Sequence, residues 1–292
     1  MVSIVKRRKA NSDYYYLYHD SRGTARRQYE EYLGKSIPPD VEERKNGFML
    51  RILRGGWEPK LSIIHDRFER ERASMPRTIL EKNLDAFAVR FTYNTQRIEG
   101  STLSLKDTTL LLEDGITPAG RPIADVLEAA AHRIVFLDAI RDDDLSRDRV
   151  VEWHRRMFGG TKEDIAGKIR DYDVRVGQSE FVPPPHSAVG ALVGLFFEWY
   201  EASRKVLHPV ELAALVHLKF VTIHPFGDGN GRISRLMMNH VLHRSGYPMM
   251  DIEYRDRRSY YGALERSQTR AADWPFLRWS VGRYLRMHSR YW

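Results

Sequence analysis

The sequence IHPFGDGNGRISR, residues 223–235, decides how this chain is organised. Residues 210–223 lead into it with apolar side chains at helical spacing, and an amphipathic run over residues 233–241 follows it. Three glycines and an aspartate separate the two runs. Because glycine-rich clusters interrupt helices, we expect a helix, a tight loop and a second helix.

This glycine-rich loop is suited to binding an anion. The first N–H groups of a helix have no intrahelical acceptor, and the helix dipole adds positive potential there. Gly227, Gly229 and Gly231 would let the backbone approach phosphate oxygens. Arg232 and Arg235 lie three residues apart, so both guanidinium groups could point from one helix face toward a polyphosphate.

Two other side chains of the loop suit phosphate chemistry. Asp228 could bind a hard cation such as Mg²⁺, which prefers carboxylate, phosphate and water ligands. His224 carries a side chain that ordinarily exchanges protons near neutral pH. The pattern therefore predicts a site that moves a phosphate-linked group onto a nucleophile.

Two common types of nucleotide-binding loop fit the sequence less well. A dinucleotide-binding loop should follow a strand, whereas a helical pattern precedes this one. A P-loop requires Gly-Lys-Ser/Thr, which is absent. The remaining alternative is a capped structural turn with a surface histidine.

Residues 224–235 resemble a known family signature. They match H-P-F-x-[D/E]-G-N-[G/K]-R-x-x-R of Fic (Fido) domain proteins at every defined position. The resemblance implies transfer of AMP from ATP to a target hydroxyl, with His224 as general base and Mg²⁺ (or Mn²⁺) bound by Asp228. It also implies phosphate contacts for the remaining motif residues, which are Gly229, Asn230, Gly231, Arg232 and Arg235.

Composition sets outer limits on the class of protein. A chain of 292 residues with 42% hydrophobic residues can form one large domain, or a domain with an appendage. It has no cysteine, which excludes disulfides, thiolate zinc sites and cysteine nucleophiles. The N-terminus lacks a signal-peptide core and no apolar run has transmembrane length, so we expect a soluble, cytoplasmic protein without membrane contact.

The net charge of +8 suits an anionic ligand and would equally suit nucleic acid. Most basic residues alternate with acidic ones, and residues 6–9 form the one compact basic cluster. We therefore expect a nucleotide ligand rather than a nucleic-acid partner.

Residues 1–38 are expected to form a small N-terminal β extension. Short runs rich in β-branched and aromatic residues alternate with polar breaks, which predicts a meander of two or three strands. The runs lie at 2–5, 14–18 and 27–33, and the breaks at 11–13 and 20–23.

Residues 39–119 show a helical pattern, which Gly55-Gly56 and Pro59 are expected to interrupt. A helix over about residues 78–100 ends in the sequence TQRIEG. Its Thr95 and Glu99 lie four apart on one face, and Gly100 ends the helix.

This hexapeptide resembles the inhibitory motif [S/T]-x-x-x-E-[G/N] of Fic proteins. A glutamate at a helix C-terminus is unfavourably placed relative to the dipole, so it should find a cationic partner. The resemblance implies that Glu99 pairs with Arg235 and takes the charge that would hold the ATP γ-phosphate. The alternative is a surface salt bridge.

Residues 120–292 are expected to form the catalytic domain. The expected fold is mainly α: a Fic (Fido) helical domain with a short β-hairpin flap, preceded by the small β meander. Apolar spacing predicts helices at 126–140, 146–158, 189–203 and 210–220, and a last helix to about residue 287.

Residues 167–185 alternate like a strand pair around Gly177-Gln178, which predicts the hairpin. It resembles the Fic flap, which lies over the active site and pairs with a target segment as an added strand. The resemblance implies that Val174, Arg175, Val176 and Gly177 border the nucleotide; the alternative is a connecting hairpin without a role.

Residues after the signature resemble the adenine side of Fic proteins. Tyr260 and Tyr261 could stack on a base, and Gln268 stands where some relatives carry asparagine. Aromatic residues at these positions could equally serve packing.

The sequence thus supports three functions. The first is transfer of AMP to a Ser, Thr or Tyr hydroxyl of a target protein that docks on the flap, or of the chain itself, with Glu99 as inhibitor. The second is removal of AMP, or transfer of another nucleotide or phosphate group. The third is a partner-binding or nucleic-acid-binding regulator. The oligomeric state is open, with a homodimer among the options.

Overall fold

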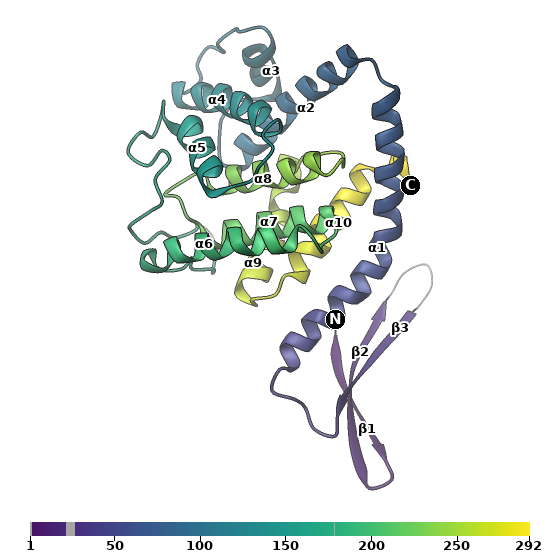
Figure 1. The fold of residues 1–292 in the computed structure, drawn as a ribbon. Helices are drawn as coiled ribbons and strands as arrows, with labels where there is room; N and C mark the ends of the chain where they lie inside the picture. The colour runs from purple at the N-terminus through teal and green to yellow at the C-terminus, as the bar shows by residue number, and fades with distance from the viewer. Residues whose placement is uncertain (1, 22–26, 178) are drawn as a thin grey trace.

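The computed structural model describes residues 2–21, 27–177 and 179–292. This part of the chain is mainly helical, with a three-stranded antiparallel sheet at the N-terminus (Figure 1), as the sequence predicts. Arg22 and Gly23 of the predicted break and Gln178 of the predicted hairpin lie outside the described residues.

The N-terminal sheet has the strand order β1-β2-β3 and confirms the predicted meander. Leu17 and Leu33 of the sheet are buried against Phe48 of the first helix. The sheet therefore has a small apolar core of its own, and Figure 1 shows it beside the start of α1, apart from the other helices. The strands are β1 (Ser3–Lys9), β2 (Ser12–Ser21) and β3 (Arg27–Gly34).

Helix α1 (Val41–Ser74) is continuous, so the interruption predicted at residues 55–56 and Pro59 is wrong. Trp57 and Leu61 are both buried in the main core on this stretch. Their packing outweighs the low helix propensity of glycine and proline. The two halves of α1 run in different directions (Figure 1), as expected for a helix with an internal proline.

Helix α2 (Arg77–Ile98) confirms the helix predicted at about residues 78–100. It ends at Ile98, and Gly100, with a φ of 99°, leaves helical geometry two residues later. The last three turns of α2 are largely buried, against α4 (Ile123–Ala139) and α8 (Asn230–Arg244). The C-terminus of α2 is thereby placed next to the glycine-rich motif.

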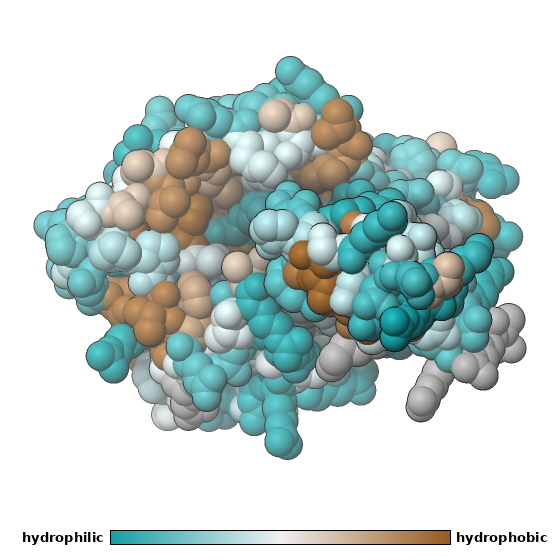
Figure 2. All heavy atoms as spheres, turned by 90° about the horizontal axis from the view of Figure 1, so that it is seen from below, coloured by the Kyte–Doolittle hydropathy of each residue, from teal (hydrophilic) through white to brown (hydrophobic). Residues whose placement is uncertain are grey.

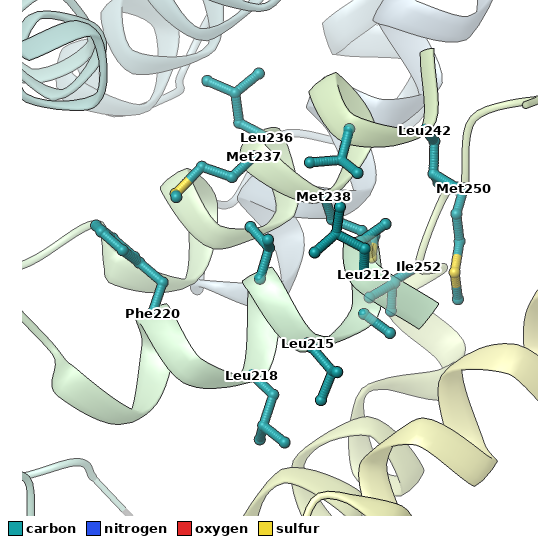
Figure 3. Packing of buried hydrophobic residues seen from close by; sticks show 14 of the residues in the cluster. Leu212, Leu215, Leu218, Phe220, Leu236, Met237, Met238, Leu242, Met250 and Ile252 are labelled. Carbon is teal, nitrogen blue, oxygen red and sulfur yellow. The ribbon is translucent and has the colours of Figure 1, made fainter. Parts of the chain in front are cut away.

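The helices predicted after residue 120 are all present, and the antiparallel pair α7 and α8 lies at their centre. Figure 3 shows leucine and phenylalanine side chains of α7 and leucine and methionine side chains of α8 in one apolar cluster, and both helices are buried almost entirely. The other elements are α3 (Leu105–Glu113), α5 (Arg147–Phe158), α6 (His186–Ser203), α7 (Pro209–Ile223), η1 (Tyr254–Asp256), α9 (Arg257–Thr269), α10 (Trp274–Met287) and η2 (Ser289–Tyr291).

The surface seen from below the view of Figure 1 is mostly hydrophilic, with separate apolar patches (Figure 2). None of the helices in the described part of the chain combines the length and the apolar character that a bilayer crossing requires.

The predicted hairpin is wrong for the described residues, because 171–177 and 179–185 contain no strand. The Arg170 guanidinium donates to the carbonyl oxygens of Tyr172 (2.9 Å) and Pro184 (2.6 Å). Three successive prolines cannot donate to a strand ladder. A side chain therefore holds this segment as a loop in place of backbone pairing.

The end of α2 is also fixed to the segment before α9. Asn94 donates to the Asp251 carboxylate at 2.7 Å and accepts from the Tyr254 N–H at 3.0 Å. Burial raises the pKa of Asp251 from 3.8 to about 6. The ionised carboxylate is therefore disfavoured in the folded state, a penalty that is absent below about pH 4 and complete above about pH 6.

We expect Asp251→Asn to raise the free energy of unfolding by about 1–3 kcal/mol at about pH 7.5, because asparagine carries no buried charge. The variant should match the parent at about pH 4, where both side chains are neutral. Urea unfolding at the two pH values measures the difference. The exposed Asp143→Asn is the control, and an equal gain at both pH values would contradict the assignment.

Candidate active site

The motif forms the predicted helix, loop and helix. His224 ends α7 in a left-handed conformation with a φ of 53°, and its N–H donates to the Phe220 carbonyl at 3.1 Å. Gly229, with a φ of 79°, precedes α8, which begins at Asn230. Glycine suits this position because other residues rarely adopt such a φ.

Asn230 closes the loop from inside. Its side-chain oxygen accepts from the Phe226 N–H at 2.9 Å, and its amide donates to the Phe226 carbonyl at 2.8 Å. The side chain is buried, so it fixes the shape of the loop in this structure. The sequence had predicted a phosphate contact for this residue.

His154 of α5 supports the same loop from the opposite side. The Gly167 N–H donates to its Nδ1 at 2.9 Å, so Nε2 carries the proton and donates to the Asp228 carbonyl at 3.0 Å. Burial lowers the pKa of His154 to about 4, which keeps it neutral. Its ring stacks on Phe226 at 3.8 Å. No local signal in the sequence marks this histidine, which lies 70 positions upstream of His224.

Arg170 joins the motif to the loop 171–185. Its guanidinium is buried and donates to the His224 carbonyl at 2.8 Å, besides the two loop carbonyls. An arginine that donates to backbone carbonyls matches no short sequence motif, so the sequence did not predict a role for Arg170. Through Arg170, the position of His224 depends on the path of the loop.

His224 is arranged to accept a proton. Its Nδ1 lies 3.2 Å from the Val221 carbonyl, which can only accept, so Nδ1 carries the hydrogen and Nε2 has a free lone pair. Burial lowers the pKa of His224 below 6.5, and the Val221 carbonyl only partly opposes this. The side chain is therefore neutral, and basic, near pH 7.

Arg235 is fully buried and makes the predicted ion pair with Glu99. Its guanidinium donates to the Glu99 carboxylate at 2.6 Å, to the Thr95 hydroxyl at 2.5 Å and to the Tyr260 hydroxyl at 3.2 Å. Thr95 and Glu99 thus act from one face of α2, as their spacing predicts.

The Glu99 carboxylate also lies against the first turn of α8. A Cβ atom added at Gly231 would come 2.4 Å from Glu99 Oε1. Backbone N–H groups and the helix dipole favour an anion at this place. The anion that lies there in this structure is the side chain of Glu99.

Arg232 has a different set of partners from Arg235. It makes a close ion pair with Glu128 of α4, a second with Asp228 at 3.2 Å, and a hydrogen bond to Gln96 at 3.1 Å. Its guanidinium lies over the Phe158 ring, 4.4 Å from the centroid. The sequence had predicted that the two arginines point together toward one open space. In this structure they do not.

Asp228, the predicted Mg²⁺ (or Mn²⁺) ligand, faces two cationic side chains. Lys162 Nζ lies 2.7 Å from Asp228 Oδ2 and 2.8 Å from Glu128 Oε1. Burial alone would raise the pKa of Asp228, but the Arg232 charge and the Lys162 hydrogen bond lower it to about 2. The described residues contain no group of three or more His, Cys, Asp and Glu side chains suited to a metal ion.

Residues 144–242 match the model of the Fic/DOC family. This part of the chain is similar to proteins of that family. The chain is 33% identical over 211 residues to "Protein adenylyltransferase fic-1" of Caenorhabditis elegans, covering 70% of this chain and 41% of the relative. It is 36% identical over 183 residues to "Protein adenylyltransferase Fic" of Aedes aegypti, covering 61% and 36%. The chain thus spans less than half the length of these curated relatives.

Two solved structures confirm the Fic fold of the helical region. A Fic domain containing signaling protein from Bacteroides thetaiotaomicron superposes with a TM-score of 0.70 at 28% identity, over 80% of this chain and 94% of that one. A Fic-1 fragment from C. elegans gives a TM-score of 0.70 at 28% identity, over 83% of this chain and 72% of the fragment.

The two tyrosines of the predicted adenine side differ in exposure. Tyr260 is only 1% exposed, and its hydroxyl contacts Arg235 and, at 2.9 Å, His217. Its ring therefore cannot stack on a base in this structure. Tyr261 is 43% exposed, and its hydroxyl donates to the Ile98 carbonyl at the end of α2 at 3.1 Å.

Gln268 borders a hollow of about 460 Å³ between α6, α7 and the segment that joins α9 to α10. Its amide donates to the Thr222 hydroxyl at 3.2 Å. Leu192 and Trp199 of α6 form much of the opposite wall. Gln268 therefore borders a mainly apolar hollow, and its predicted contact with a ligand stays a prediction.

The loop predicted as the Fic flap is attached to α9. Within residues 174–177, Val174 and Val176 are half-buried, whereas Arg175 and Gly177 are exposed. The Ser179 hydroxyl and the Glu180 N–H both donate to the Glu265 carboxylate, at 3.0 and 2.8 Å. Glu265 lies one helical turn from Tyr261, so the loop contacts the same face of α9 as the one that carries Tyr261.

We expect Gly229→Ala to lower the free energy of unfolding by about 2–4 kcal/mol. The alanine would have to adopt a φ of 79°, and its Cβ would come 2.3 Å from the Phe158 ring. The control is Gly190→Ala in α6, where no atom lies within 4 Å and alanine should stabilise the helix slightly. Urea unfolding compares the two, and similar effects would contradict the close approach of Phe158 to the motif.

Proposed function

We propose that this protein transfers AMP from ATP to a Ser, Thr or Tyr hydroxyl of a target protein, and that Glu99 inhibits this transfer. The proposal is carried by one observation: a carboxylate from α2 is bound by Arg235 at the N-terminus of α8, where an anion is favoured. The relatives are named adenylyltransferases, which supports AMP as the transferred group.

His224 acts as the general base in this mechanism. The target hydroxyl oxygen attacks the α-phosphorus of ATP, the bond to the β-phosphate oxygen breaks, and pyrophosphate leaves. The hydroxyl proton passes to His224 Nε2, which is free because Nδ1–H donates to Val221. The N–H groups at the start of α8 stabilise the charge that develops on the phosphates.

Glu99 inhibits by competing with phosphate for Arg235. Burial would lower the pKa of Arg235, but nearby Tyr260 and Glu99 raise it, so the guanidinium stays charged and needs an anion. A second anion beside Glu99 would be repelled at these distances. Without Glu99, Arg235 would keep Thr95 and Tyr260 as partners and could bind a phosphate oxygen.

The other participants are part of the proposal. In this structure the residues around Asp228 do not present an open position for Mg²⁺ (or Mn²⁺), so no step here passes through a metal ion. The target, or a second copy of the chain in self-modification, would dock at the loop 171–185, where Val182 is 70% exposed. A cytoplasmic location and a homodimer remain expectations from the sequence.

Removal of AMP from a modified protein is a second candidate function. The observation that favours it is the position of the Glu99 carboxylate beside the predicted phosphate site, where it could orient a water molecule for attack on phosphorus. In that case Glu99→Gly would abolish hydrolysis of an AMP-modified protein, whereas it would enhance transfer.

We expect Glu99→Gly to increase nucleotide transfer about tenfold or more, because it frees a buried guanidinium for phosphate. Intact-protein mass spectrometry after incubation with each nucleoside triphosphate and a cell lysate measures the transfer and identifies the added group. Glu113→Gly at the exposed end of α3 is the control. If Glu99→Gly modifies no protein with any donor, the proposed activity is wrong.

Within the Glu99→Gly background, we expect His224→Asn to abolish transfer while ATP binding changes less than about threefold. Asparagine is chosen because it tolerates the left-handed backbone at this position. With His224 intact, the midpoint of the acid-side decline in transfer should lie below pH 6.5, because burial lowers the pKa of the histidine. A midpoint above pH 6.5 would exclude this role.

A further inference from the structure

Four charged side chains form a closed cluster beside the motif. Lys162 and Arg232 each contact both Glu128 and Asp228. They come from four separate segments: α4, the turn after α5, the motif loop and α8. Two carboxylates and two cations leave the cluster without net charge.

The Lys162 ammonium lies between two carboxylate oxygens, at 2.7 Å from Asp228 and 2.8 Å from Glu128. A hard divalent cation prefers such a position, since carboxylates and water are its usual ligands. Lysine is a compact point charge that can take the place of a small cation there.

Lys162 is also the cation of the cluster that can leave. Its side chain is 33% exposed, whereas that of Arg232 is 4% exposed. Both cations lie over the Phe158 ring, Arg232 at 4.4 Å and Lys162 at 5.3 Å from its centroid. A lysine at this depth can turn its ammonium into solvent while its carbon chain stays in place. Its backbone is held by the bond from its N–H to the Phe158 carbonyl at 2.8 Å.

We propose that Lys162 is an internal cation that holds the position beside Asp228 against a divalent metal ion, so that a metal ion enters only when the ammonium is displaced. For nucleotide binding, the inference rests on the proposed function. There it adds a second barrier that is independent of Glu99, because Glu99 acts on Arg235 and Lys162 acts on Asp228.

The charge balance separates this idea from a purely structural ion pair. Replacing Lys162 by methionine keeps the length of the side chain but leaves two carboxylates with one guanidinium. The cluster then has one net negative charge and an unfilled position between Asp228 and Glu128. A structural ion pair predicts a loss of stability and no gain in affinity for a cation.

The test uses Mn²⁺ alone, with free Mn²⁺ measured by electron paramagnetic resonance. We expect Lys162→Met to bind one Mn²⁺ about tenfold more tightly than the parent. Adding Asp228→Asn should abolish the gain. The control is Lys168→Met, since Lys168 is exposed and donates to the Asp164 carbonyl. Lys162→Gln serves as a second variant if Lys162→Met does not fold. Equal Mn²⁺ affinity in the folded variant and the parent would overturn the proposal.

A second measurement follows binding of a fluorescent ATP analogue, with Mn²⁺ and with EDTA, in the Glu99→Gly background. Lys162→Met should increase the affinity gained from Mn²⁺ by about tenfold and leave binding in EDTA unchanged. Weaker binding in EDTA would make Lys162 a phosphate ligand and overturn the proposal. If the analogue binds to no variant while Lys162→Met still gains Mn²⁺, the proposed function fails and the inference about the cation position stands.

Discussion

A buried guanidinium that must be neutralised is the constraint on which the site depends. Arg235 lies at the centre of the helical region, and an uncompensated charge there would cost several kcal/mol. Glu99 supplies the compensating charge in this structure, and Thr95 and Tyr260 satisfy other donors. The end of α2 is consequently part of the site, although it lies more than 130 residues upstream of Arg235.

The loop itself is shaped by side chains that bind its backbone groups. Asn230, His154 and Arg170 each make side-chain hydrogen bonds to backbone groups of the motif. Each satisfies donors or acceptors that would otherwise be buried without partners. The position of His224 therefore depends on Arg170, which binds its carbonyl, as well as on its place in the motif.

The sequence could predict the parts of the structure that depend on local spacing. The helix–loop–helix of residues 210–241 follows from glycine placement, and the three strands follow from their polar breaks. The Glu99–Arg235 pair was predicted because both residues belong to recognisable motifs. The helices and strands are set by short-range preferences, which a single sequence contains, whereas the pair was implied by the resemblance to Fic proteins.

The sequence could not predict the parts that depend on distant partners. Packing of Trp57 keeps α1 continuous through Pro59, and Arg170 replaces a strand ladder in the loop 171–185. Burial of Tyr260 likewise reflects contacts with Arg235 and His217. The Lys162–Glu128 contact joins two residues that no motif connects.

The covalent connection of α2 to the rest of the chain gives Glu99 the properties of a tethered ligand. Its effective concentration at Arg235 is set by the geometry of the folded chain and not by the concentration of the protein. Dilution of the protein therefore cannot relieve the contact. Arg235 can exchange one anion for another in two ways. Either a nucleotide binds tightly enough, at its free concentration, to compete with the tethered Glu99, or a partner shifts the docking of α2.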